Sequence, residues 1–66
     1  MEGYRTWKYL VMNHRLTNSL PRLFFVEASC ISEAVCRIQT YCETEYTIID
    51  KYEPNIAKIL GYQEIL

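Results

Sequence analysis

The pattern of apolar and polar positions divides the chain into strand-like stretches and one helix-like stretch. Residues 23–42, LFFVEASCISEAVCRIQTYC, run from an apolar segment through a short turn into an amphipathic segment. From Ile31 to Cys42 the apolar residues recur every three or four positions, which is the spacing of one face of a helix. Residues 22–28 alternate in period two and are rich in aromatic and β-branched side chains, so they predict a strand.

Two further strands are predicted on either side of this unit. Residues 4–13 alternate loosely and carry apolar side chains on both faces, which predicts a strand that is central or covered on both sides. Residues 14–22 contain turn-forming residues, including Pro21, and predict the loop of an antiparallel hairpin. Residues 45–53 alternate with mixed polarity and predict a third strand with one solvated face or at a sheet edge.

The ends of the predicted helix are marked by polar residues. Ser29 or Cys30 is expected to cap its N-terminus, and a serine at position 30 would complete a capping box with Glu33 that cysteine breaks. Glu33 and Arg37 stand four residues apart in the order that favours an ion pair. Glu43 is acidic where the helix dipole disfavours acid, so the helix is expected to end at or before it.

The segment after Pro54 fits two structures. Residues 55–61, NIAKILG, fit a helical turn capped by Asn55 and stopped by Gly61, but they also fit a strand that resumes after the proline. The strand is favoured here. The whole pattern predicts one small α+β domain, residues 1–66, with an antiparallel sheet of three to four strands and one helix packed on one face (β-β-α-β). The expected core is Trp7, Tyr9, Val11, Phe24, Val26, Ala28, Ile31, Ala34, Val35, Ile38, Ile48 and Leu60.

Composition adds an excess of apolar side chains for the size of the chain. Half of the 66 residues are apolar and 14% are aromatic. Because a domain this small buries only about 60% of its unfolded surface, these side chains either fill an aromatic core or form a surface for a partner. The chain shows no secretory signal and no apolar run of the ~20 residues that a membrane span needs. Three cysteines without a CxxC pair fit a reducing compartment, so we expect a cytoplasmic protein with no membrane partner.

Charge is unevenly distributed, although the net charge is −1. Residues 1–22 carry four basic residues and one acidic residue, whereas residues 23–66 carry three basic and seven acidic residues. These charges either steer a partner or face each other across paired strands. One acidic set would imitate a nucleic-acid backbone, bind a basic protein surface or form a solvated strand face: Glu43, Glu45, Asp50 and Glu53.

No pattern of residues predicts catalysis or a cofactor. His14 is the single histidine, and no cysteine stands at a fixed spacing from it that would indicate a nucleophile with its base. Cys30, Cys36 and Cys42 are six residues apart, which is not the spacing of a zinc site. We therefore expect no enzyme, no metal and no cofactor.

The first strand interleaves aromatic and basic residues, as single-strand nucleic-acid binders do. The residues are Tyr4, Arg5, Trp7, Lys8 and Tyr9, with Arg15 near the loop end. Two observations oppose this hypothesis. Lys8 points to the opposite face from Trp7 and Tyr9, and the chain is slightly acidic, whereas such binders are basic.

Residues 26–34, VEASCISEA, form a strand-to-helix turn that resembles turns in small bacterial and phage proteins. From Phe24 to Leu60 the chain resembles an uncharacterised family of Bacteroidetes and their phages. The same layout is similar to a compact type I-F anti-CRISPR protein that binds the Cascade surveillance complex. Cys30 departs from the serine that these patterns prefer. The resemblance implies a phage or mobile-element origin and carries over no catalytic residue.

Together these observations predict a small non-enzymatic binding protein. It would occupy a surface of a host protein complex, such as an anti-phage defence (CRISPR-Cas) assembly, in the host cytoplasm. Two alternatives stay open: a single-strand nucleic-acid-binding domain that uses the aromatic and basic strand, and a small obligate homo-oligomer.

Overall fold

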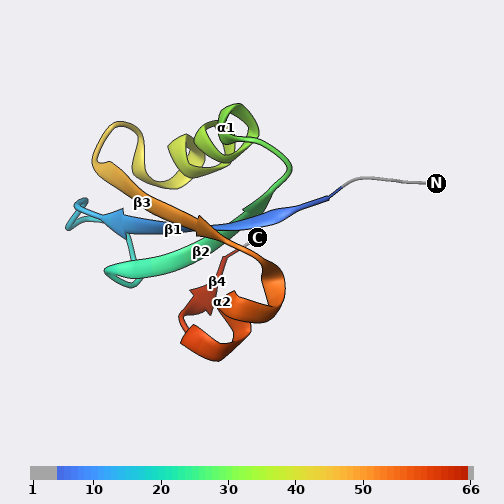
Figure 1. Ribbon diagram of the computed structural model, residues 1–66. Helices are drawn as coiled ribbons and strands as arrows, with labels where there is room; N and C mark the ends of the chain where they lie inside the picture. Colours follow the sequence, from blue (N-terminus) through green and yellow to red (C-terminus); the bar gives the residue numbers. More distant parts are fainter. Residues whose placement is uncertain (1–4, 66) are drawn as a thin grey trace.

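A four-stranded sheet lies between two helices in the computed structural model, which describes residues 5–65 (Figure 1). The elements are β1 (Trp7–Asn13), β2 (Leu23–Ala28), α1 (Ile31–Cys42), β3 (Tyr46–Tyr52), α2 (Pro54–Leu60) and β4 (Gln63–Glu64). The strand order is β3-β1-β2-β4. The expected α+β fold and the antiparallel hairpin of β1 and β2 are confirmed. The sheet is mixed, however, because β4 runs parallel to β2.

The larger core lies between α1 and one face of the sheet. Tyr9, Val11, Phe24 and Val26 project from β1 and β2 and pack against Ala34, Ile38 and Cys42 of α1. The apolar face predicted by the alternation in the strands meets the apolar face predicted by the helical spacing in α1. Most of the predicted core is therefore buried as expected. Ile31 is an exception: it is 53% exposed because α1 lies over β1 and β2 and its first turn is left open to solvent.

A second core lies on the opposite face of the sheet, where no helix was expected. Leu10 and Phe25 are buried there with Ala57 of α2, and the ring of Tyr52 meets Phe25 edge-on at 6.1 Å. The two helices therefore cover opposite faces, above and below the sheet in Figure 1. Leu60 was expected in the core, but it is 44% exposed on the outer side of α2.

The preference for a strand over residues 55–61 is wrong, because these residues form α2 and its C-cap. Pro54 occupies the first turn, where its fixed φ suits a helix and its missing N–H costs nothing. Glu53, not Asn55, is the N-cap residue. Gly61 ends the helix in the left-handed conformation, at φ 80°, as the helical alternative required.

The boundaries of α1 agree with the prediction. Cys30 is the N-cap and makes no side-chain cap bond, which fits the broken capping box. Glu33 instead reaches back to Ser29, whose N–H and hydroxyl both donate to its Oε1, at 2.7 and 2.9 Å. Arg37 donates to Glu33 at 3.3 Å, as the spacing predicted. The helix ends at Cys42, and Glu43 follows with a positive φ of 54°.

Candidate protein-binding surface

Tyr9, one of the residues of the aromatic and basic strand, is enclosed by the fold. It is 4% exposed beneath α1, and this burial raises the pKa of its phenol. Its ring is therefore not available to stack on a base. Tyr4, another residue of this set, lies outside the described residues.

Lys8 faces the α2 side of the sheet, where its ammonium lies between two carboxylates. Its Nζ donates to Glu64 at 2.7 Å and to Glu27 at 3.2 Å. Burial alone would lower the pKa of Lys8, but the two carboxylates outweigh it and raise the pKa. This charge is neutralised within the fold and does not form part of a phosphate-binding surface.

Trp7 is half-buried and lies beneath two cations. Arg5 Cζ is 4.7 Å from the ring centroid and Lys51 Nζ is 4.4 Å from it. Arg5 also forms an ion pair with Glu53. These contacts join the segment before β1 to the end of β3. The aromatic and basic residues here are therefore explained by cation–π and ionic contacts within the fold.

The remaining predicted charged residues gather at the other end of the sheet. Arg15 donates to Glu43 at 2.9 Å and lies 3.8 Å from Glu45, so the hairpin loop is tied to the turn after α1. The hydrogen bond to Glu43 raises the pKa of Arg15. Asp50 stands apart from this group on β3, where it accepts the N–H of Lys51 at 2.7 Å. The acidic set therefore does not form one continuous surface.

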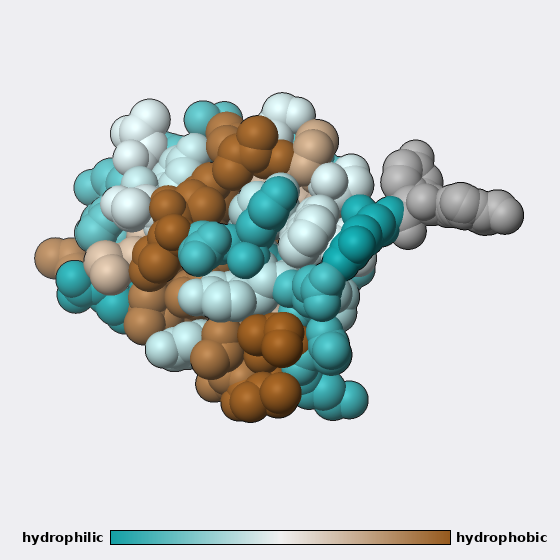
Figure 2. All heavy atoms as spheres, in the orientation of Figure 1, coloured by the Kyte–Doolittle hydropathy of each residue, from teal (hydrophilic) through white to brown (hydrophobic). Residues whose placement is uncertain are grey.

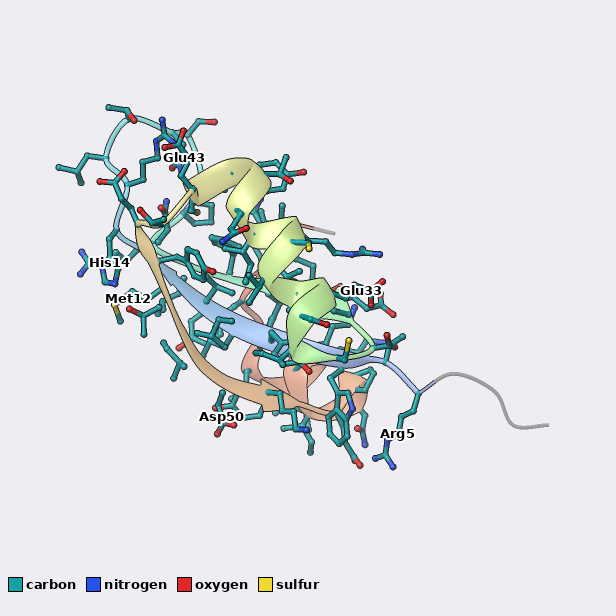
Figure 3. All side chains as sticks on the ribbon, turned by 90° about the horizontal axis from the view of Figure 1, so that it is seen from above. Arg5, Met12, His14, Glu33, Glu43 and Asp50 are labelled. Atoms are coloured by element: carbon teal, nitrogen blue, oxygen red, sulfur yellow. The ribbon has the colours of Figure 1, made fainter. Side chains whose placement is uncertain are left out.

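A groove that the sequence reasoning missed lies between α1 and β3. It has a volume of about 320 Å³ and is lined by Tyr9, Ile31, Ile48, Asp50 and Lys51. The view from above shows β3 running beside α1 instead of beneath it (Figure 3). Because α1 packs mainly against β2, the side of β3 that faces α1 is only partly covered. The groove is floored by Tyr9 and walled by two isoleucines.

The outer edge of β3 has no neighbouring strand among residues 5–65. The register against β1 shifts between Leu10 and Val11, and Ile49 is the extra residue of this bulge. Such a bulge, with charged residues beside it, protects an edge against indiscriminate strand pairing. The edge before the bulge, from Tyr46 to Ile48, keeps regular strand pairing with β1.

Apolar side chains also cover the outer side of α2. Ile56, Ile59 and Leu60 are 42%, 79% and 44% exposed and lie at i, i+3 and i+4, so they share one face of the helix. Ile49 and Tyr62 are exposed as well. In Figure 2, hydrophobic surface extends over α1, β3 and α2 on the face towards the viewer. We call the exposed side chains of α2, Ile56, Ile59 and Leu60, the α2 patch.

The sequence did contain a signal for these surfaces. Ile48 and Ile49 are adjacent apolar residues in an alternating strand, so one of them must leave the α1 side of the sheet. Ile56, Ile59 and Leu60 have helical spacing, and with Ala57 they make more apolar side chains than one buried face of a short helix can hold. The predicted strand over residues 55–61 would divide these side chains between two faces, so it conceals the second of the two signals.

Two of the groups that catalysis would need are engaged elsewhere, whereas Cys30 and Cys36 are exposed. Nε2 of His14 lies 2.8 Å from the hydroxyl of Thr47, and Cys42 is buried, which raises the pKa of its thiol. Residues 5–65 contain no cluster of side chains that would hold a metal ion. No helix in the described part of the chain is long and apolar enough to cross a membrane.

A polar cavity of about 360 Å³ opens at the junction of β2 and α1, lined by Thr6, Glu27, Ala28, Ser29, Glu33 and Arg37. Its carboxylates accept bonds from the protein itself. Thr6 donates to Glu27 at 2.8 Å, and Ser29 donates to Glu33. The cavity therefore offers a ligand few unsatisfied groups.

Comparisons with protein-family models, with curated proteins and with solved structures found no match for this chain.

Proposed function

We propose that this chain is a small non-enzymatic binding protein that acts by covering a surface of another protein. The observation that carries the proposal is the exposed apolar surface on α1, β3 and α2. Ile59 is 79% exposed and Ile31 is 53% exposed, in a domain whose charged side chains mostly pair with one another. Exposed apolar surface of this kind on a small domain is typical of a protein–protein contact.

The partner class follows from the sequence resemblance. Similarity of residues 24–60 to small phage proteins, and of the layout to an anti-CRISPR protein, supports a host assembly as the target. A defence complex of the CRISPR-Cas type is the first candidate. A protein of this size would inhibit such an assembly by occupying a surface that the assembly needs for its own function.

Affinity capture from a host lysate, with the tagged full chain as bait, tests this function. The wild-type protein should retain one host protein or complex in stoichiometric amount. Ile59→Lys should reduce the captured amount, because a charge in the α2 patch must lose its water at the interface. A cation near the C-terminus of a helix suits the dipole, so α2 itself should remain folded.

Gln39→Lys is the matched control, because Gln39 is exposed on α1 and faces solvent. It adds the same charge outside both apolar surfaces and should leave capture unchanged. If wild type, the control, Ile59→Lys and Ile31→Asp, which charges the exposed apolar side chain of α1, all retain the same proteins, the captured material is nonspecific and the proposal fails. A purified defence complex whose activity is unaffected by an excess of the protein would exclude that target.

A further inference from the structure

We propose that β3 pairs with β3 of a second copy of this chain, antiparallel, about a two-fold axis that passes through Thr47. The four-stranded sheets of the two copies join edge to edge. Because such an axis is perpendicular to the sheet, both copies keep α2 on the same face and the α2 patch stays free. This inference goes beyond the proposed function and does not depend on it.

The outer edge of β3 carries backbone groups that no other strand among residues 5–65 uses. The N–H of His14 donates to the carbonyl oxygen of Glu45 at 2.9 Å, and β1 and β3 stay in regular register from there to Ile48. In an antiparallel pair, the residues that exchange hydrogen bonds alternate along each strand. Glu45 and Thr47 thus direct their groups towards β1. The N–H and C=O groups of Tyr46 and Ile48 point away from it, to the free edge.

The bulge confines this regular edge to three residues, from Tyr46 to Ile48. Leu10 of β1 continues the same alternation and stands opposite Asp50, so the groups of Asp50 point back to β1. The outward groups of the regular edge therefore lie one residue to either side of Thr47. A two-fold axis at Thr47 sets Tyr46 of each copy opposite Ile48 of the other, and every outward N–H of the segment meets an outward C=O.

No other axis along β3 matches these groups without a conflict of charge. An axis at the first strand residue sets Ile48 opposite Thr44, which lies in the turn before the strand. An axis at Ile48 or Ile49 sets an outward-pointing residue opposite Asp50, whose groups point to β1. An axis at Asp50 or Lys51 sets like charges opposite each other. An axis between two neighbouring residues opposes inward and outward groups or, inside the bulge, brings the two Asp50 side chains together.

The register about Thr47 also pairs compatible side chains. Tyr46 and Ile48 project to the α1 side of the sheet and are only partly buried there. Each faces the other type across the axis, and a pair of an aromatic and a β-branched residue stabilises neighbouring strands. Thr47 is exposed on the opposite face and meets Thr47 of the other copy, which is a favourable pair as well. These contacts form beyond the outer edge of β3 and leave the groove beneath α1 unoccupied.

The ends of the paired segment limit the affinity. The register brings Glu45 of each copy near Asp50 of the other, and these like charges repel. Glu45 lies 3.8 Å from the guanidinium of Arg15, which reduces this repulsion without removing it. Three paired residues also bury less than the roughly 800 Å² that each partner of a standard interface buries. We therefore expect a weak dimer that Asp50→Asn tightens severalfold and that added salt strengthens.

Sedimentation velocity of the full chain, from micromolar to millimolar concentration, tests the inference. A monomer and a dimer should interconvert without larger species, because pairing about a two-fold axis closes on itself. An NMR dilution series locates the interface. The amide resonances of Tyr46 and Ile48 should shift with concentration, because their N–H groups gain acceptors in the dimer, whereas those of β2 should not.

A charge exchange at Thr47 tests the position of the axis. Thr47→Lys and Thr47→Glu should each weaken the dimer by at least about tenfold, because each sets like charges opposite each other. An equal mixture of the two variants should associate again, because lysine then faces glutamate. Thr47 is exposed, so both variants should fold, which circular dichroism checks. Gln39→Lys and Gln39→Glu, at an exposed position on α1, are the matched controls and should associate as wild type does, alone and mixed.

Several results would overturn the inference. These are a wild-type chain that stays monomeric at millimolar concentration, single charged variants that dimerise as wild type does, or a mixture of the two that stays monomeric. If the charged variants do not fold, the dilution series of the wild type decides. Concentration-dependent shifts that spare Tyr46 and Ile48 would then reject this edge as the interface. Capture of a host protein is measured separately, so either proposal can fail without the other.

Discussion

The Lys8 ammonium lies 2.7 Å from a carboxylate oxygen of Glu64 and so joins the central strand β1 to the C-terminal strand β4. β4 has only two residues and pairs with Phe24 and Phe25 of β2. The N–H of Ile65 donates to the carbonyl oxygen of Phe25 at 2.9 Å, and the side chain of Ile65 packs against the α1-side core. The ion pair therefore holds a short strand that few backbone bonds would keep in place.

Glu64→Gln should loosen β4 without unfolding the domain. The amide of Ile65 should exchange with deuterium severalfold faster, while the amides of β1 should keep their protection, because the change affects a local opening. The loss of global stability should be at most about 1 kcal/mol, since Glu64 is half-exposed and its ion pair is partly screened. Glu53→Gln breaks the ion pair with Arg5 and is the control. Equal exchange of Ile65 in the two variants would contradict the role of Glu64.

Gly61→Ala should destabilise the protein by about 1 kcal/mol, measured by urea unfolding. Gly61 holds a φ of 80°, which costs an L-residue with a Cβ roughly 1–2 kcal/mol. Space is not the reason, because a Cβ at this position would meet only the Ile59 carbonyl oxygen, at 4.0 Å. Gly61→Asn should cost less than Gly61→Ala, since asparagine tolerates the left-handed region. An alanine variant as stable as wild type would mean that α2 does not end as described.

The α1 side of the fold was predictable because local and tertiary signals agree there. The stripe of Ala34 and Ile38 and the alternation of Phe24 and Val26 each select one face, and the short turn between them brings these faces together. The unexpected exposure of Ile31 has a tertiary cause: α1 is displaced from β3, and no local pattern records how a helix is positioned across a sheet.

The α2 side was not predictable from local patterns. Seven residues from Pro54 to Leu60 fit two periodicities, and the choice depends on Ala57 packing against Leu10 and Phe25, which are distant in sequence. β4 is still less visible, because two residues carry no periodicity and their partner strand lies almost forty positions earlier. The groove was missed for the same reason, since it exists only through the placement of α1 relative to β3.

Asn18→Ala should destabilise the domain by about 1–3 kcal/mol. The Asn18 side chain donates to the Tyr41 carbonyl oxygen at 3.1 Å, and its oxygen accepts from the Asn13 amide at 2.8 Å. Asn13 is buried, so the substitution leaves its amide with weaker partners. Thermal unfolding measures the effect. Ser19→Ala, at an exposed position in the same loop, should be close to neutral, and an equal loss in both variants would contradict this account.

Acid should destabilise the protein through Glu27 and Glu33. Hydrogen bonds from Thr6 and Lys8 lower the pKa of Glu27, and those from Ser29 lower the pKa of Glu33, below the usual 4.5. Since the folded pKa values lie below the unfolded ones, the unfolded chain binds more protons in this range. Their stabilising effect is fully present above the unfolded pKa and is lost as pH falls through the folded values.

Denaturant unfolding at successive pH values checks this. Stability should change little between about pH 7 and pH 5.5 and fall below that range. In the variant that combines Glu27→Gln and Glu33→Gln, stability should depend less on pH over the same interval. The account is contradicted if the free energy of unfolding of the wild type rises on acidification, or if it depends on pH as steeply in the double variant as in the wild type. Either result would show that these carboxylates are not stabilised in the folded protein.

Trp7 provides a test of the nucleic-acid alternative. Its fluorescence reports on the ring that the sequence pattern assigned to base stacking. Arg5 and Lys51 already stand over this ring, Lys8 is paired and Tyr9 is buried. Titration with single-stranded oligothymidine at low salt should therefore leave the emission unchanged. Emission that is quenched in proportion to binding and restored by salt would revive that function. The quenching should then persist in Lys51→Ala, where movement of Lys51 cannot cause it, and would show that a base displaces the cations.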